Sequence, residues 1–265
     1  MVPFRRKKSL GSRVIKRGRE LRKAAPQLDL PWARSWIAGV VRAGVLRVVL
    51  RPLMDFYTRR RATGRDMLSS VRGPVILVAN HTSHIDTPVI LAALPRRLRR
   101  RTAVAAAADY FYGNKVVASI VSLIFNTVPI ERKGGGLGKQ AAGHLDRLLD
   151  EGWNLLVYPE GTRRGSGPGR VRKGAAVLAN RHNLPVVPIR VTGTRAVMPP
   201  GRRWPKRLRG KVVSKRHRVQ VAFGEPITGV DDAGEVIGRV QRFFDESSRA
   251  NGGRRLRRRV TSASH

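Results

Sequence analysis

Short apolar runs alternate with helix-like stretches along most of the chain, and this alternation limits the fold more than any other feature. One run, at 75–79, follows Gly73 and Pro74, and similar runs occur at 154–158 and 186–191. Each run has the length of a buried strand, and glycine and proline mark the places where strands begin or end. A chain that alternates strands with helices predicts an α/β fold, with helical layers on a sheet.

The same patterns place the individual elements. We expect strands at 75–79, 102–108, 154–158, 186–191 and 218–223. We expect helices at 32–60, 87–94, 173–181 and 235–247, and a further helix that opens at the glycine cluster 134–138 and ends near Leu149. The apolar run 116–125 is too short to cross a bilayer, because a spanning helix needs about 20 apolar residues.

Composition divides the chain into four expected segments. These are a basic flexible arm at 1–30, an amphipathic membrane-associating helix at 31–60, a folded domain at 61–250 and a basic disordered tail at 251–265.

The second segment is apolar from Trp36 to Met54, but Arg42, Arg47 and Arg51 interrupt it. It would therefore make a poor transmembrane span. We interpret it as an interfacial helix, with its apolar side in the acyl boundary of a membrane and its arginines at anionic headgroups. The alternative is a helix that packs on the core of the domain.

The charge of the chain limits its partners. There are 54 Lys and Arg against 17 Asp and Glu, a net charge of +37, and such a surface attracts polyanions. Aromatic residues make up only 6%, and no helix-turn-helix, zinc-finger or RNP-like motif is present, which argues against specific nucleic-acid binding. Anionic membrane lipids are the predicted partner, although part of the charge can be a solvated coat. The absence of cysteine excludes disulfides and a cysteine nucleophile.

The first candidate site follows the strand at 75–79. His81 can act as a general base, and Asp86 can fix its tautomer. Five residues on an ideal helix would put the two side chains on different faces, so they meet only if the chain turns between them. The alternatives are a helix-capping cluster and a core histidine. Ser83 as a nucleophile and a metal held by His81 and His84 are further readings, and the second lacks a third ligand.

The second candidate site follows the strand at 154–158. Gly161 allows close approach of the backbone, and the side chains of Thr162 and Arg163 can donate hydrogen bonds to a phosphate. Glu160 could hold the loop or an arginine in place, and the alternative is a turn with a surface ion pair. Arg132, which follows another strand-like stretch, is a further candidate phosphate ligand.

Taken together, these segments resemble the glycerophosphate and lysophosphatidic acid acyltransferase family (1-acyl-sn-glycerol-3-phosphate acyltransferase type). The matching residues, in chain order, are Asn80, His81, Ser83 and Asp86, then Arg132, then Pro159 to Arg163, and then the apolar segment 184–189. Tyr158 and Arg164 stand where the family pattern has Phe and Ser. The resemblance covers roughly residues 60–230, with four blocks in the family's order.

The resemblance implies a single acyltransferase domain with a mixed sheet flanked by helices. It implies that His81 and Asp86 are catalytic and that no metal or cofactor is needed. The donor would be acyl-CoA or an acyl-carrier protein, and the acceptor lysophosphatidic acid, with glycerol 3-phosphate, another lysophospholipid or a glycolipid as alternatives. The enzyme would lie on the cytoplasmic face of the cell membrane, peripheral or monotopic. The predicted substrate-binding residues are Ser83, Arg132, Glu160, Gly161, Thr162 and Arg163.

Overall fold

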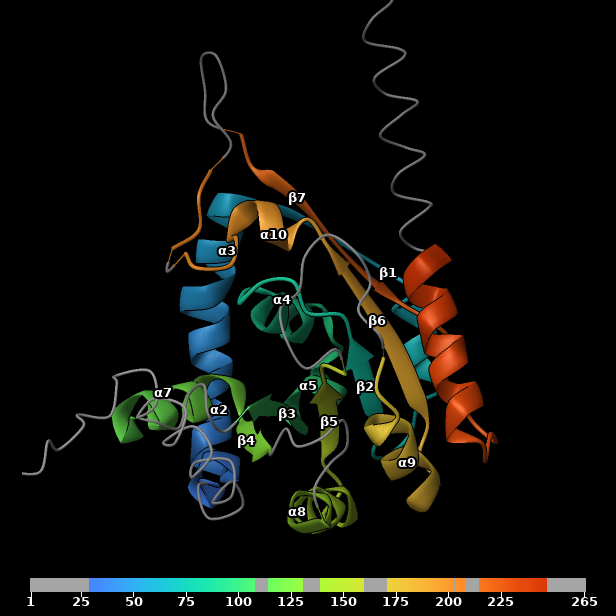
Figure 1. The fold of residues 1–265 in the computed structure, drawn as a ribbon. Coiled ribbons are helices and arrows are strands. Elements are labelled where there is room, and N and C mark those ends of the chain that lie inside the picture. The colour runs from blue at the N-terminus through green and yellow to red at the C-terminus, as the bar shows by residue number, and fades with distance from the viewer. Residues whose placement is uncertain are drawn as a thin grey trace, which may run out of the picture.

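The computed structural model describes residues 29–107, 114–130, 139–159, 171–202, 204–207 and 215–246. Within them the chain forms a seven-stranded sheet in the order β1-β7-β6-β2-β5-β3-β4 (Figure 1). The strands are β1 (Thr58–Thr63), β2 (Ile76–Ala79), β3 (Thr102–Ala107), β4 (Thr127–Ile130), β5 (Asn154–Val157), β6 (Val186–Thr192) and β7 (His217–Phe223). All pairs are parallel except β6 with β7. The expected α/β fold with a mixed sheet is confirmed.

Helices flank the sheet. The N-terminal ones are η2 (Pro31–Arg34), α2 (Trp36–Gly44), η3 (Val45–Leu50) and α3 (Arg51–Tyr57). The others are η4 (Asp66–Ser69), α4 (Asp86–Ala93), α5 (Arg96–Arg100), α7 (Lys115–Phe125), α8 (Lys139–Asp150), α9 (Gly174–Arg181), α10 (Thr194–Val197) and a helix at 233–246. The long N-terminal helical segment, blue in Figure 1, and the last helix, red, lie at opposite sides of the molecule.

The central strand β2 separates two hydrophobic cores. Successive side chains of a strand point to opposite faces of the sheet. Leu77 and Ala79 accordingly belong to a core that includes residues of α4, whereas Ile76 and Val78 belong to a core that includes residues of α8, α9 and the last helix. Because both faces are covered, all four residues of β2 are buried. This explains why the strand is a continuous apolar run rather than an alternating one.

The first strand was not predicted, and the expected continuation of the N-terminal helix to residue 60 is wrong. The helix ends at Tyr57, and the Thr58 hydroxyl donates to the Met54 carbonyl oxygen at 2.6 Å. β1 then pairs with β7 at one edge of the sheet. Its sequence, TRRRAT, lacks an apolar run, but charged side chains suit an edge strand because they discourage pairing with other chains.

The N-terminal helical segment packs against other helices of the domain. α2 lies beside α7, and the Arg42 side chain is turned inward toward it. Arg42 Nε donates to the Leu123 carbonyl oxygen at 2.9 Å, and the guanidinium also bonds the carbonyls of Ser122 and Ala33. Burial lowers the pKa of Arg42 to about 10. The expectation that Arg42 meets a lipid headgroup is therefore wrong.

The other expected elements agree with the structure to within two or three residues at most ends. The apolar run 116–125 forms α7, and the last helix begins at 233, slightly before its expected start. No helix in the described parts of the chain is both long enough and apolar enough to traverse a bilayer. The expected basic arm and tail lie outside the described residues, apart from positions 29 and 30.

Candidate active site

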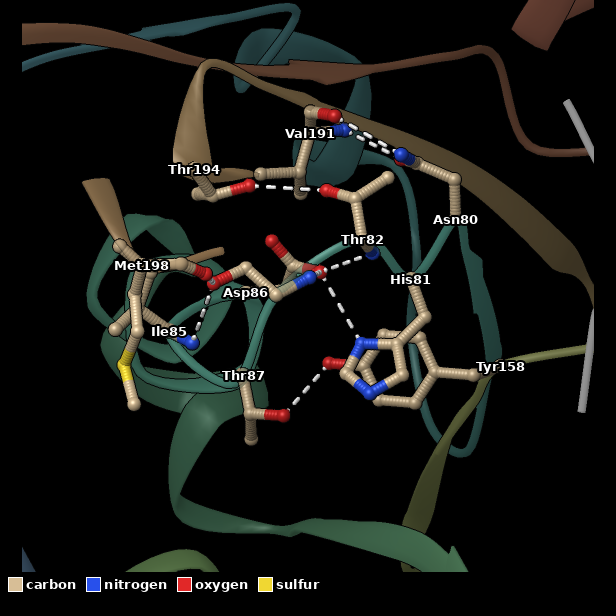
Figure 2. A network of polar contacts seen from close by, with 11 residues as sticks. Asn80, His81, Thr82, Ile85, Asp86, Thr87, Tyr158, Val191, Thr194 and Met198 are labelled. Atoms are coloured by element: carbon tan, nitrogen blue, oxygen red, sulfur yellow. Dashed lines mark hydrogen bonds and ion pairs between the residues drawn. The ribbon is translucent and has the colours of Figure 1, made fainter. Parts of the chain in front are cut away.

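The loop between β2 and α4 brings His81 and Asp86 together. β2 ends at Ala79 and α4 begins at Asp86, so the chain turns in the six residues between them. His81 Nδ1 lies 3.1 Å from Asp86 Oδ2 (Figure 2). The Asp86 side chain is fully buried, whereas 18% of the His81 side chain is exposed. Because Nδ1 faces the acid, Nε2 lies at the opposite side of the imidazole ring.

Asp86 also holds the shape of this loop. Its Oδ2 atom accepts hydrogen bonds from the backbone N–H groups of Thr82, at 2.6 Å, and Ser83, at 2.8 Å. Hydrogen bonds of N–H groups to a carboxylate are stronger than those between neutral groups. One oxygen therefore fixes both the imidazole and the backbone that carries it.

Asn80 connects the same loop to the sheet. Its side-chain amide donates to the Val191 carbonyl oxygen at 2.9 Å and accepts from the Val191 N–H at 2.6 Å. The β2–β6 ladder ends with the pair of Ala79 and Ile189, and the Asn80 side chain adds one further rung to it. His81 thus directly follows a residue whose side chain makes two hydrogen bonds to the buried strand β6.

The turn after β6 makes hydrogen bonds to the loop between β2 and α4. The Thr82 and Thr194 hydroxyls lie 3.1 Å apart, and the Ser83 hydroxyl donates to the Met198 carbonyl oxygen at 2.8 Å. This turn depends on Gly193, which has φ of 87°. A Cβ at that position would lie 2.1 Å from the Arg218 carbonyl oxygen, so only glycine fits.

Ser83, a predicted substrate-binding residue, is buried, and its hydroxyl donates a hydrogen bond to the Met198 carbonyl oxygen. In this structure it braces the loop. A direct contact with substrate stays a prediction for this residue, as does the nucleophile alternative.

The aromatic ring of Tyr158 covers one side of His81. The two ring centroids are 4.2 Å apart with an angle of 30° between the planes, which is a stacked arrangement (Figure 2). The Tyr158 hydroxyl lies 2.8 Å from Thr87 Oγ1. The sequence placed Tyr158 at the end of the strand 154–158, before the second candidate site, and as a substitution in a family pattern. It gave Tyr158 no role, and its position at a strand end was the available signal.

The remaining predicted site residues lie outside the described part of the chain. They are Arg132, Glu160, Gly161, Thr162 and Arg163. The described strands next to them, β4 and β5, run in the same direction as β2. The carboxyl ends of parallel strands meet at one edge of a sheet, which is where α/β proteins bind ligands.

No metal centre is found among the described residues. Groups of three or more His, Cys, Asp or Glu side chains that could hold a metal ion do not occur in these parts of the chain.

Comparison with known proteins identifies the family. The family model for acyltransferases matches residues 59–192, a segment that contains the His81–Asp86 pair. The chain belongs to the acyltransferase family. Nothing in the comparisons supports the nucleic-acid alternative.

Two curated relatives within the acyltransferase family illustrate the similarity. A chloroplast 1-acyl-sn-glycerol-3-phosphate acyltransferase of Brassica napus is 27% identical over 145 residues, which cover 52% of this chain and 38% of the relative. A probable 1-acyl-sn-glycerol-3-phosphate acyltransferase of Mycoplasma genitalium is 28% identical over 158 residues, 59% of this chain and 58% of the relative. The matched segments thus span less than two thirds of these relatives.

A relative with a different name and a solved structure are also similar to this chain. N-acylphosphatidylethanolamine synthase of Arabidopsis thaliana is 33% identical over 58% of this chain and 56% of its own length. The crystal structure of the 1-acyl-sn-glycerophosphate acyltransferase PlsC from Thermotoga maritima has a TM-score of 0.59 at 21% identity. This match covers 89% of this chain and 87% of that one, and it shows that the fold is shared.

Proposed function

We propose that this protein is a membrane-surface O-acyltransferase that moves a fatty acyl group from acyl-CoA or an acyl-carrier protein to the hydroxyl of lysophosphatidic acid. The product is phosphatidic acid. The observation that carries the proposal is the contact of His81 Nδ1 with the buried Asp86 carboxylate at the carboxyl end of β2. This arrangement directs Nε2 away from the acid.

The reaction uses this pair directly. Nε2 of His81 takes the proton of the acceptor hydroxyl while its oxygen attacks the thioester carbonyl carbon. The tetrahedral intermediate collapses, the carbon–sulfur bond breaks, and the proton on the imidazole passes to the leaving thiolate. The products are an ester and a free thiol, and no covalent acyl-enzyme, metal or cofactor is required.

Asp86 stabilises the imidazolium that forms during this proton transfer. Its charge is buried and lies 3.1 Å from Nδ1, so Nδ1 carries a proton and Nε2 is the basic nitrogen in the resting state. General acid–base catalysis of this kind contributes about 10²- to 10⁴-fold.

The acceptor is selected by its phosphate. Arg132, Arg163 and the loop at 160–162 are the proposed ligands, because a guanidinium can pair bidentately with phosphate oxygens. Support comes from the position of β4 and β5, whose carboxyl ends share the sheet edge with β2. One relative is named for a different lipid product, as an N-acylphosphatidylethanolamine synthase. Glycerol 3-phosphate, another lysophospholipid and a glycolipid therefore remain the alternative acceptors.

The proposed membrane contact is an apolar surface that α2 and α7 form together. We call it the α2–α7 surface, and its exposed members are Trp36, Ile37, Val40, Val41, Val116, Val117 and Ile120. Trp36 is 79% exposed, and α2 lies beside α7 (Figure 1). Exposed apolar surface of this kind is typical of membrane or protein contact.

The charge of the chain favours a membrane with anionic lipids as the partner of this surface. The net charge is +37, and Arg47 on η3 and Lys115 on α7 are exposed. Each basic residue near an anionic leaflet contributes about 1 kcal/mol to binding. We therefore place the enzyme peripherally or monotopically on the cytoplasmic face of the cell membrane.

An acyl-transfer assay with the purified protein tests the proposal. Acyl-CoA and acyl-carrier protein are each crossed with lysophosphatidic acid and glycerol 3-phosphate, and the position of the new ester is determined. We expect the highest rate with lysophosphatidic acid and a loss of at least about 10²-fold in His81→Ala. His182→Ala is the control because His182 pairs with Asp146 on α8, outside the site. Full activity of His81→Ala would refute the base assignment.

A further inference from the structure

Tyr158 reaches His81 because two neighbouring strands end at the same edge. Tyr158 directly follows β5, and β5 pairs in parallel with β2 through Val78 and Val157. The phenol ring of Tyr158 therefore lies beside His81, which is two positions after the end of β2. The centroid distance of 4.2 Å and the angle of 30° correspond to a face-to-face contact of the tyrosine and the imidazole.

The Tyr158 ring is itself held by the helix that carries the acid. Its hydroxyl lies 2.8 Å from the side-chain oxygen of Thr87, the residue after Asp86 in the first turn of α4. His81 and Tyr158 are thus attached to consecutive residues of one helix, as Figure 2 shows. Burial raises the pKa of the Tyr158 hydroxyl well above its ordinary value, and the nearby Asp86 charge raises it further. The phenol stays neutral and keeps this hydrogen bond.

The two contacts restrict different motions of the imidazole. The bond to Asp86 fixes the position of Nδ1 but permits the ring to tilt about that contact. A stacked ring on one face removes this freedom, so Nε2 keeps one direction. A displacement of about 1 Å in a reacting group costs up to about 10²-fold in rate.

We propose that Tyr158 is a positioning residue for His81, with its ring stacked on the imidazole and its hydroxyl anchored by Thr87. This inference rests on the proposed role of His81 as the base. It concerns a hydroxyl group that the family pattern, with Phe at this place, does not supply.

Steady-state kinetics of matched variants test the inference. Tyr158→Leu removes the stacked ring, and we expect kcat to fall by about 10²-fold with unchanged KM values for donor and acceptor. Tyr158→Phe and Thr87→Val each remove the same hydrogen bond, and each should lower kcat by about 2- to 10-fold. The double variant should be no slower than the slower single variant, because the two changes share one interaction.

Tyr57 supplies the control. It is also half-buried against the same hydrophobic core as Tyr158, but it lies in α3. Tyr57→Phe and Tyr57→Leu should leave kcat unchanged within about 2-fold, even where thermal stability falls as it does in Tyr158→Leu. An equal fall in kcat for Tyr57→Leu and Tyr158→Leu would overturn the inference, because loss of packing alone would then explain both.

Proton NMR of the histidine rings gives a readout that does not depend on turnover. The ring current of Tyr158 should shift the His81 ring protons upfield, and the His81→Ala spectrum assigns these signals. The shift should persist in Tyr158→Phe and disappear in Tyr158→Leu. A shift that is unchanged in Tyr158→Leu would overturn the stacked geometry.

The outcomes separate this inference from the proposed function. If His81→Ala is inactive while Tyr158→Leu keeps the wild-type kcat, the positioning role fails and the base assignment stands. If His81→Ala keeps full activity, the proposed mechanism fails, and the positioning role fails with it even where the NMR shift shows stacking. A raised acceptor KM with unchanged kcat in Tyr158→Leu would also refute positioning, since it would assign Tyr158 to substrate binding.

Discussion

A single carboxylate oxygen, Asp86 Oδ2, contacts the imidazole of His81 and two backbone N–H groups. These contacts have different consequences. The N–H bonds need only an acceptor, which an amide oxygen also supplies. Stabilisation of an imidazolium needs a negative charge.

Asp86→Asn separates the two roles. The amide oxygen can still accept from Thr82 and Ser83, so we expect the fold to be retained, with a circular dichroism melt close to that of the wild type. The lost charge no longer stabilises the imidazolium, and this should lower kcat by about 10²-fold or more. The KM for the acyl donor should stay within about 2-fold. An Asp86→Asn variant with wild-type kcat would remove the acid from the mechanism.

The sequence indicated the residues of this pair but not how they are held. His81 and Asp86 were expected to meet only if the chain turned between them, and it does. The supporting contacts could not be predicted, because Thr194 and Met198 follow their partners by 112 and 115 positions. Such contacts depend on how the strands are ordered in the sheet. The predicted phosphate ligands lie outside the described residues and stay predictions.

Among the elements, α2 and α7 differ most from ordinary domain helices. Each presents large apolar side chains to solvent, and Arg42 links them by donating to carbonyl groups of α7 and η2. In the sequence, Arg42 interrupts an apolar stretch. In the structure its guanidinium points toward these carbonyl groups and away from the exposed side of α2. The exposed side of α2 is consequently more apolar than the sequence pattern indicated.

A charge placed on the α2–α7 surface tests its membrane role. Val117→Asp should weaken binding to vesicles of phosphatidylglycerol and phosphatidylcholine by about 10-fold or more, because a buried valine side chain contributes about 1.5 kcal/mol or more. Val177→Asp on α9 is a matched control, since Val177 is 45% exposed and Val117 is 43% exposed. Vesicle sedimentation measures both variants. Equal binding by the two would assign the membrane contact to another surface.

Other elements were missed for identifiable physical reasons. β1 is an arginine-rich edge strand, and its register with β7 is set by backbone hydrogen bonds rather than by apolar alternation. The π-helical η3 continues α2 with six residues, VLRVVL, and no local pattern distinguishes it from an ordinary helix. Strands with long apolar runs, such as β2, β5 and β6, could be predicted because both of their faces are buried.

At the scale of the whole molecule, the large positive charge and the α2–α7 surface make different contributions to membrane binding. Charge attraction weakens as salt shortens the Debye length, from about 10 Å at 0.1 M to about 3 Å at 1 M. Apolar insertion is not screened in this way. The two contributions can therefore be separated by ionic strength.

Vesicle binding should accordingly fall in two stages. Raising salt from 0.1 M to 1 M should weaken binding of the wild type to anionic vesicles by at least about 10-fold. The affinity that remains at 1 M salt should be lost in Val117→Asp. His81→Ala should bind vesicles as tightly as the wild type. Tighter binding to duplex DNA than to anionic vesicles at physiological salt would contradict the choice of a membrane as the partner.

The general architecture could be predicted, but the sheet order could not. Alternating strands and helices indicate an α/β fold, and both hydrophobic cores follow from the apolar strands. The position of β1 beside β7, and the single antiparallel pair of β6 with β7, depend on contacts between distant parts of the chain.

The pairing of Asn80 with Val191 has a consequence for watching the catalytic loop. The Val191 amide proton is held by a side chain of that loop rather than by a strand neighbour. Its exchange with deuterium is therefore governed by opening of the loop, whereas neighbouring amides of β6 exchange only when the sheet itself separates. The amide signal of Val191, one residue before the end of β6, should thus report how often the loop that carries His81 opens.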